Sequence, residues 1–325
     1  MSIPSPLTKK AHREQYPAID PTNPANSAAG KTVAISGGTG GIGYLIARGF
    51  AKAGAAAVIL LARRQSALDE GSSKLRIELA AAGLSTEVWT YLLDIRDKAS
   101  TDAVFAALRD RVRAEGKGND IDILVANAGD MAQGEALLDY APETVRGAFD
   151  TNVFGNLNLV RAYLAPEAPA IPMQAMTGKV KDVSKAMAPG DEKIVLNVST
   201  GVIHMRSPGH ALYSSSKLAF THMLKHLQLE VDQLPGAPVR IHSFNPGVIF
   251  TPGALKNSGS DKVLAQFLFD DESLPEGFTV WLASPAAAFL KGRFVWSSWD
   301  VEELVAMKQK FEEDPEFCQM TLKGL

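Results

Sequence analysis

The 325-residue sequence has little of several features, and each shortage excludes a class of protein. A single cysteine, Cys318, rules out an intramolecular disulfide and suits a reducing compartment. No stretch approaches ~18 uninterrupted apolar residues, so we expect no membrane span. The N-terminus carries scattered prolines in place of an apolar run, which argues against a secretory signal. These absences predict a soluble, cytoplasmic protein.

The sequence also lacks a large excess of charge of either sign. The 33 Lys and Arg residues nearly balance the 36 Asp and Glu residues, and no basic run occurs. Nucleic acid is therefore not an expected partner. Clusters of Asp, Glu and His at metal-ligand spacing are absent, so no catalytic metal is expected. What is present is a hydrophobic content of 46%, which is typical of a globular protein with a sizeable core.

Short apolar runs alternate with longer amphipathic segments along the chain. This alternation, with continuously apolar strands, predicts an α/β fold: a single doubly wound, Rossmann-like parallel sheet with helices on both faces. We expect strands at 32–36, 57–62, 87–93, 122–126, 194–199, 239–244 and 292–296, and helices at 42–53, 66–82, 98–115, 142–164 and 211–233.

One domain is expected over residues 30–325, preceded by an extended N-terminal arm at 1–29. Residues 165–191 have the composition of an inserted loop, and 299–325 form a tail. Residues 247–277 follow the carboxyl end of a strand, where ligands bind in open α/β sheets, so we expect a substrate loop there.

A glycine cluster follows the first predicted strand and opens a helix. Gly38, Gly40 and Gly43 satisfy G-x-G-x-x-G, while Gly37, Gly41 and Gly43 equally satisfy G-x-x-x-G-x-G. Either pattern permits a tight turn and close approach of the backbone to a diphosphate at the helix N-terminus. A glycine cluster alone also makes ordinary strand–helix turns, but the flanking strand and helix favour a nucleotide site.

The second predicted strand ends in Arg63 and Arg64, where NAD-binding chains usually place an acid for the ribose. Two guanidiniums suit a 2′-phosphate, so we predict NADP(H). The alternative is that both arginines are solvated surface charges.

A phenol and an amine lie four residues apart at Tyr213 and Lys217, one turn apart on one helix face. An ammonium favours the phenolate, so we expect a lowered phenol pKa and proton transfer near neutral pH. Thr200 lies thirteen residues before Tyr213 and Ser199 fourteen before it. Adjacent strand residues point to opposite faces, so only one of these hydroxyls can face the cleft, and the spacing favours Thr200.

Taken together, these motifs resemble the short-chain dehydrogenase/reductase superfamily over most of residues 31–300, and the N-terminal arm and C-terminal part are similar to fungal members associated with secondary metabolism. Ser36 replaces the Thr that usually begins the family's glycine loop, and Thr200 replaces its usual Ser. The resemblance implies cofactor contacts from Ser36, Gly37, Gly38, Thr39, Gly41, Ile42, Gly43, Arg63, Arg64, Asp94, Ile95, Asn127, Ala128, Gly129, Tyr213, Lys217, Pro246, Gly247, Val248 and Thr251.

The resemblance also implies roles at the reacting centre. Hydride passes between the nicotinamide and a carbonyl carbon, Thr200 holds the carbonyl oxygen, and Tyr213 donates the proton. Lys217 lowers the Tyr213 pKa and binds the nicotinamide ribose. Asn152 holds a water that relays protons to Lys217; alternatively, it is a buried Asn that satisfies helix backbone groups.

The expected activity is an NADP(H)-dependent interconversion of a ketone and a secondary alcohol on a lipophilic small molecule. Non-redox chemistry on the same scaffold, as an isomerase, dehydratase or cyclase, stays open, and so does a nucleotide-sensing regulator. By the resemblance we also expect a homodimer or homotetramer.

Overall fold

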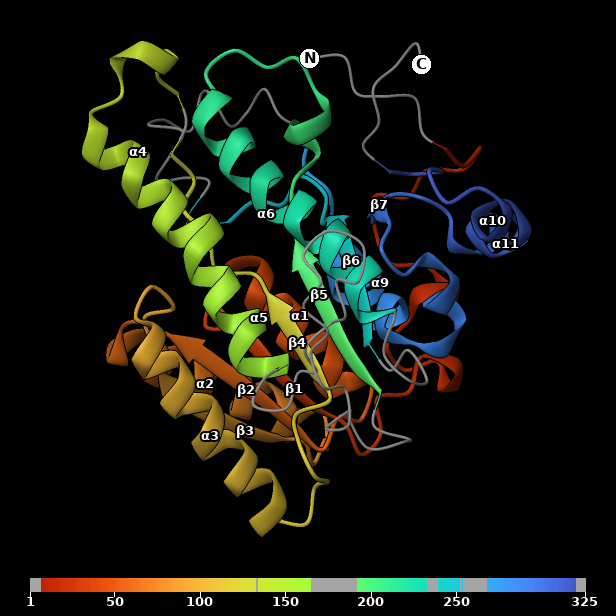
Figure 1. The fold of residues 1–325 in the computed structure, drawn as a ribbon. Coiled ribbons are helices and arrows are strands. Elements are labelled where there is room, and N and C mark those ends of the chain that lie inside the picture. Colours follow the sequence, from red (N-terminus) through yellow and green to blue (C-terminus); the bar gives the residue numbers. More distant parts are fainter. Residues whose placement is uncertain are drawn as a thin grey trace, which may run out of the picture.

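Seven strands form the centre of the protein in the computed structural model, which describes residues 7–132, 134–164, 192–232, 239–251, 253 and 268–319 (Figure 1). The sheet order is β3-β2-β1-β4-β5-β6-β7, and every neighbouring pair is parallel. The strands are β1 Thr32–Ser36, β2 Ala57–Ala62, β3 Glu87–Leu92, β4 Ile123–Ala126, β5 Lys193–Val198, β6 Val239–Asn245 and β7 Phe294–Trp296.

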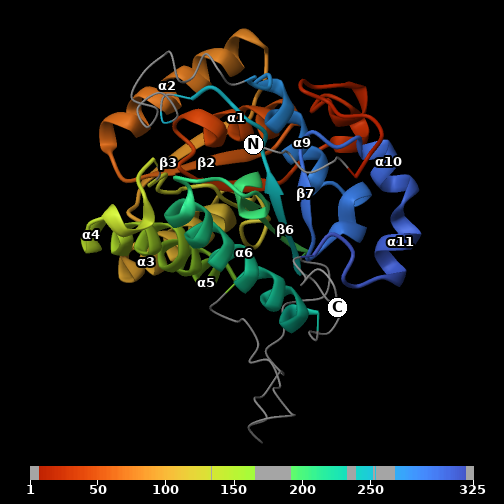
Figure 2. The same ribbon diagram turned by 90° about the horizontal axis from the view of Figure 1, so that it is seen from above.

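Helices cover both faces of this sheet, as Figure 2 shows from above. Alternate residues of β1 divide between two cores: Val33 and Ile35 pack with α1, α2 and α9, while Ala34 packs with α3, α5 and α6. The helices are α1 Gly41–Lys52, α2 Gln65–Ala81, α3 Lys98–Ala114, α4 Pro142–Phe149, α5 Asn156–Leu164, α6 Ala211–Val231, α9 Ser273–Ala283, α10 Val301–Ala306 and α11 Lys308–Glu313.

Local sequence explains where several helices begin and end. The Asp97 carboxylate accepts from the Ser100 amide at 3.1 Å and caps the start of α3. Pro142 stands in the first turn of α4, where its missing N–H leaves no hydrogen bond unmade. Gly54 and Gly83 take left-handed φ angles of 83° and 68° just beyond α1 and α2.

The predicted fold class is confirmed, and most predicted boundaries lie within two residues of those observed. The helix expected over 142–164 is interrupted by a π-helical turn, Asp150–Gly155, between α4 and α5. The expectation of an irregular segment up to Gly277 is wrong at its end, because α9 begins at Ser273. The inserted loop expected at 165–191 lies outside the described residues.

The N-terminal arm and the C-terminal tail pack together beside α9 (Figures 1 and 2). Ala11 forms an antiparallel bridge with Trp299, and the His12 ring lies 2.8 Å from the Asp300 carboxylate. Ile19 is fully buried in the core that α1 and α9 share. Among the described residues, no helix is both long and apolar enough to cross a bilayer.

Candidate active site

The glycine loop joins β1 to α1 at the carboxyl edge of the sheet. Gly37 and Gly41 have φ angles of +64° and +52°, which favour glycine. A Cβ on Gly43 would lie 2.4 Å from the Gly37 carbonyl oxygen and 2.5 Å from Asn127 Nδ2, so no larger residue fits. Gly40 caps α1 without a side-chain hydrogen bond, which leaves the helix N-terminus open to an anion. This cradle fits the diphosphate of a dinucleotide.

Ser36 ties this loop to the neighbouring strand. Its buried hydroxyl accepts from the amides of Asn127 and Ala128, both at 3.0 Å, and donates to the Val125 carbonyl at 3.3 Å. Asn127 Nδ2 donates to the Ser36 carbonyl at 2.9 Å. These bonds hold the ends of β1 and β4 together at the point where the strand order reverses, which is the usual ligand site in such sheets.

Tyr213 and Lys217 lie one turn apart on α6, as the spacing predicted. The Thr200 hydroxyl lies close enough to Tyr213 to lower the pKa of the phenol by hydrogen bonding. Lys217 is 5% exposed, and its ammonium donates to the Val198 carbonyl at 2.9 Å. A Cβ on Gly129 would lie 3.2 Å from Lys217 Nζ, so this glycine gives the amine its space.

Burial governs the proton affinities of this pair. It raises the pKa of Tyr213 to about 12, against a lowering by the Thr200 hydrogen bond, and it lowers the pKa of Lys217 to about 8. The expectation of a lowered phenol pKa is therefore wrong for this structure. Tyr213 is a protonated acid at neutral pH, which suits it to donating a proton.

Ser199 does not belong to this group. Its hydroxyl lies 2.8 Å from that of Thr221 on α6, and it is 3% exposed. Thr200 has extended backbone angles of −155° and 147°, so the two adjacent side chains point to opposite sides. Thr200 thus faces Tyr213, while Ser199 faces the buried polar contacts of α6.

Asn152 lies in the π-helical turn and is fully buried. Its Oδ1 accepts from the Asp130 amide at 2.7 Å, and its Nδ2 donates to the Asp130 carbonyl at 2.8 Å and to Ser216 Oγ at 2.9 Å. The side chain therefore braces the loop after β4 against α6, beside Lys217. Asn152 is buried, as that alternative required, but the backbone groups that it satisfies belong to Asp130 in the loop after β4 and not to a helix.

The segment Pro246–Thr251 continues from β6 toward the glycine loop. A Cβ on Gly41 would lie 3.4 Å from the Thr251 methyl, so these two parts of the cradle meet. Gly247 takes a left-handed φ of 97°. The segment closes the cradle opposite the end of β4.

Comparison with known proteins decides the family. A family model described as short chain dehydrogenase matches residues 31–261. The chain belongs to the short-chain dehydrogenase/reductase family. It is 33% identical to a short chain dehydrogenase/reductase from Claviceps purpurea, over 99% of this chain and 95% of that protein. It is 31% identical to short chain dehydrogenase/reductase nsrO from Aspergillus novofumigatus, over 97% and 96%. The predicted similarity to fungal members is confirmed.

Solved structures of the family share the fold. L-sorbose reductase from Gluconobacter frateurii, complexed with NADPH and L-sorbose, superposes with a TM-score of 0.65. The match covers 84% of this chain and 96% of that one at 23% identity, so it bears on the fold alone.

Within the family fold, the end of β2 carries the predicted arginines. Arg63 and Arg64 are both exposed. Asp94 follows β3, and its pKa is lowered chiefly by hydrogen bonds from Arg96 and, more weakly, by the charge of Arg63. Ile95 is buried, and its carbonyl accepts from Asn158 Nδ2 at 3.0 Å.

Sequence reasoning missed three residues of this neighbourhood: Ser216, Arg96 and Asp270. Ser216 bonds Asn152, Arg96 holds Asp94, and Asp270 holds Val248. None lies in a motif that marks its role. Within the described part of the chain, no group of three or more His, Cys, Asp or Glu side chains is placed to hold a metal.

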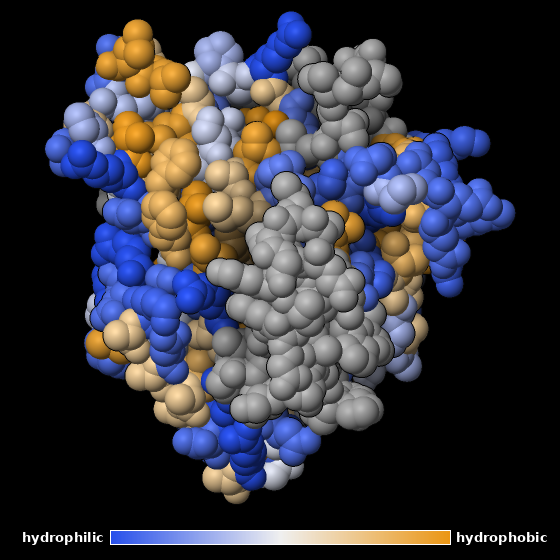
Figure 3. Space-filling view, viewed as in Figure 1, coloured by the Kyte–Doolittle hydropathy of each residue, from blue (hydrophilic) through white to orange (hydrophobic). Residues whose placement is uncertain are grey.

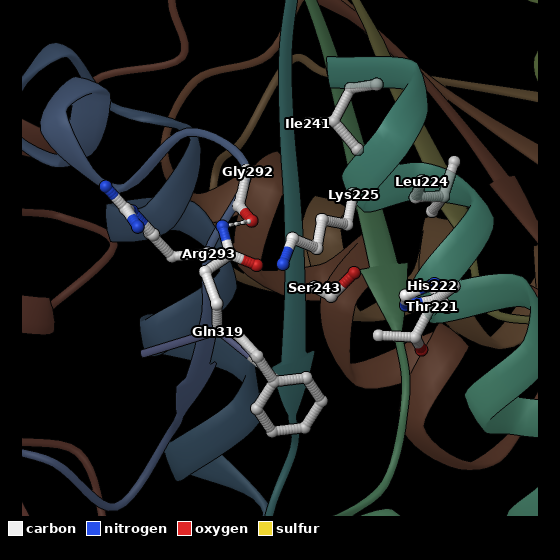
Figure 4. Close-up of a pocket in the computed structure, with 10 residues that line it drawn as sticks. Thr221, His222, Leu224, Lys225, Ile241, Ser243, Gly292, Arg293 and Gln319 are labelled. Atoms are coloured by element: carbon white, nitrogen blue, oxygen red, sulfur yellow. Dashed lines mark hydrogen bonds between the residues drawn. The ribbon is translucent and has the colours of Figure 1, made fainter. Parts of the chain in front are cut away.

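A separate cavity lies between α6, β6 and the segment that holds Gly292 and Arg293 (Figure 4). Lys225 points into it from α6, and Ser243 lines it from β6. Thr221, the partner of Ser199, forms part of its wall. Thr200, Tyr213 and Lys217 do not line it, so it is not the catalytic cleft.

Proposed function

We propose that this protein is an NADP(H)-dependent oxidoreductase that interconverts a ketone and a secondary alcohol. The observation that carries the proposal is the Thr200 hydroxyl beside the Tyr213 phenol, with the Lys217 amine one helical turn away. The group stands at the same edge of the sheet as the glycine cradle. A dinucleotide on that cradle and a carbonyl beside Tyr213 would share one cleft.

Each residue has a role in the reaction that follows from its chemistry. The bound cofactor would supply the hydride to the carbonyl carbon. Thr200 and Tyr213 bond the carbonyl oxygen, and Tyr213 gives its proton to that oxygen as negative charge develops on it. Lys217, charged below pH about 8, stabilises the phenolate left behind. The oxidative direction reverses these steps, with Tyr213 accepting the alcohol proton.

Support for a lipophilic substrate comes from the loops at the carboxyl edge. Leu137 and Leu138, after β4, are 56% and 95% exposed, and Val248 and Phe250, after β6, are 44% and 50% exposed. Exposed large apolar side chains on loops that follow the carboxyl ends of strands favour an apolar ligand. Relatives in Aspergillus and Claviceps support a substrate from fungal secondary metabolism.

Support for NADP(H) over NAD(H) comes from Arg63 and Arg64, since no acid stands at the end of β2. We expect a higher kcat/KM with NADPH than with NADH, and Arg63→Asp should shift the preference toward NADH. Equal or better use of NADH by the unaltered protein would refute this choice. Product formed without net oxidation of the cofactor would instead select an isomerase, dehydratase or cyclase.

A homodimer or homotetramer in the cytoplasm completes the proposal. Phe154, beside α5, and Met223 and Leu229, on α6, are 56%, 43% and 57% exposed. Hydrophobic atoms gather over the region of α4 and α6 (Figure 3). Apolar surface of this kind suits contact with a second copy, and sedimentation velocity would measure the assembly.

A further inference from the structure

Asp270 bonds the segment that follows β6 and lies against the glycine loop. Its Oδ2 accepts from the Val248 amide at 2.8 Å, and its own amide donates to the Val248 carbonyl at 2.8 Å. Ile249 and Asp270 form a parallel bridge at the same place. Asp270 therefore fixes Val248 by both its side chain and its backbone.

The other oxygen of the same carboxylate belongs to the N-terminal arm. Arg13 Nε lies 3.1 Å from Asp270 Oδ1, and Arg13 Nη2 donates to the Leu268 carbonyl at 2.6 Å. The Asp271 amide donates to the Arg13 carbonyl at 2.7 Å. One arginine thus holds residues on both sides of Phe269 and aims the Asp270 side chain at Val248.

Gly247 shows how closely the segment depends on this carboxylate. It has a left-handed φ of 97°, and a Cβ there would lie 2.9 Å from Asp270 Oδ2. The backbone turns against Asp270 at this point and then runs to Thr251, whose methyl would contact a Cβ on Gly41. Arg13 is thus linked through Asp270 and Val248 to the segment whose last residue, Thr251, lies beside Gly41 of the glycine loop.

We propose that Asp270, held by Arg13 of the N-terminal arm, is a positioning residue that sets the Pro246–Thr251 segment beside the glycine loop for the diphosphate of NADP(H). The inference rests on the proposed cofactor. Both partners of the Asp270 side chain are hydrogen-bond donors, so a carboxylate alone accepts from each. An asparagine of the same shape must turn its NH₂ group toward one of those donors.

The test compares Arg13→Gln, Asp270→Asn and the double variant with Lys31→Gln. Lys31 is a matched control because it forms an ion pair of similar exposure, 2.9 Å from Asp122, at the start of β1. Dissociation constants are titrated for NADPH and for adenosine 2′-monophosphate, which lacks the diphosphate and the nicotinamide. Urea unfolding without cofactor measures stability.

We expect Asp270→Asn to weaken NADPH binding about tenfold and Arg13→Gln about threefold, with the double variant no weaker than Asp270→Asn. Binding of adenosine 2′-monophosphate should stay unchanged, and Arg13→Lys should restore part of the loss. Lys31→Gln should bind both ligands normally.

Two results would overturn this inference and leave the proposed function standing. One is normal NADPH binding by both single variants. The other is equal weakening of the binding of both ligands, which would mean that Asp270 stabilises the fold in general. A natural-sequence protein that binds no NADPH would refute the proposed function first, and the inference with it.

Discussion

At the scale of single residues, the sequence spacing and the structure agree on which hydroxyl faces Tyr213. Counting along the sequence favoured Thr200 over Ser199, and the structure gives the physical reason. Thr200 is extended at the end of β5, so its neighbour turns to Thr221. The proton affinities were not predictable in the same way, because burial of Tyr213 and Lys217 depends on packing that no spacing reveals.

Thr200→Ala and Ser199→Ala should therefore differ in effect. Removing the Thr200 hydroxyl takes away a donor to the carbonyl oxygen, and kcat should fall about 10²-fold or more. Ser199→Ala loses a buried bond to Thr221, so it should lower the free energy of unfolding by about 1 kcal/mol with little effect on kcat. Steady-state rates and urea unfolding of both variants measure this, and the reverse pattern would assign the catalytic hydroxyl to Ser199.

The reaction should also respond to pH through Lys217. Its pKa is lowered to about 8, so its charge is lost as pH rises through that value, while Tyr213 stays protonated to about 12. We expect kcat/KM for NADPH in the reductive direction to fall above pH about 8. Lys217→Arg keeps its charge and should lack this fall. If kcat/KM of Lys217→Arg falls above pH about 8 in the same way, another group is responsible for the fall.

At the scale of elements, the sequence predicted what periodic apolar runs determine and missed what tertiary contacts determine. The strands and the helices α1, α2, α3 and α6 were foreseen from their buried faces, while α4 and α5 were predicted as one helix. Helix α9 was missed because its sequence contains Pro275 and Gly277, which usually interrupt helices, although both residues are buried against neighbouring parts of the fold. The π-helical turn at Asn152 gives no sequence signal either.

The contact of α9 with α1 predicts that one carboxylate contributes strongly to the free energy of unfolding. Glu276 is 1% exposed, and its Oε2 accepts from Arg48 Nε at 2.8 Å and Nη2 at 2.6 Å. Glu276→Gln removes the charge that balances Arg48, so it should cost about 3 kcal/mol in the free energy of unfolding. Glu272→Gln is the control, because Glu272 lies 3.8 Å from Arg48 and is 60% exposed. Equal unfolding midpoints for the two variants would contradict this view of the interface.

At the scale of the whole molecule, one sheet edge collects residues from most of the chain. The glycine loop, the end of β4, the π-helical turn, Thr200, α6 and the segment after β6 all meet there. The motifs could be foreseen because each follows a strand's carboxyl end. The contribution of the N-terminal arm could not, since Arg13 reaches Asp270 only through the packing of the arm beside α9.

The central claim is that this assembly reduces a carbonyl with NADPH through the Tyr213 proton. The most direct measurement follows the nicotinamide absorbance of NADPH with lipophilic ketones, for the natural sequence and for Tyr213→Phe. We predict substrate-dependent NADPH oxidation that falls about 10²–10⁴-fold in Tyr213→Phe, while NADPH binding is retained. Unchanged turnover in Tyr213→Phe would contradict the account.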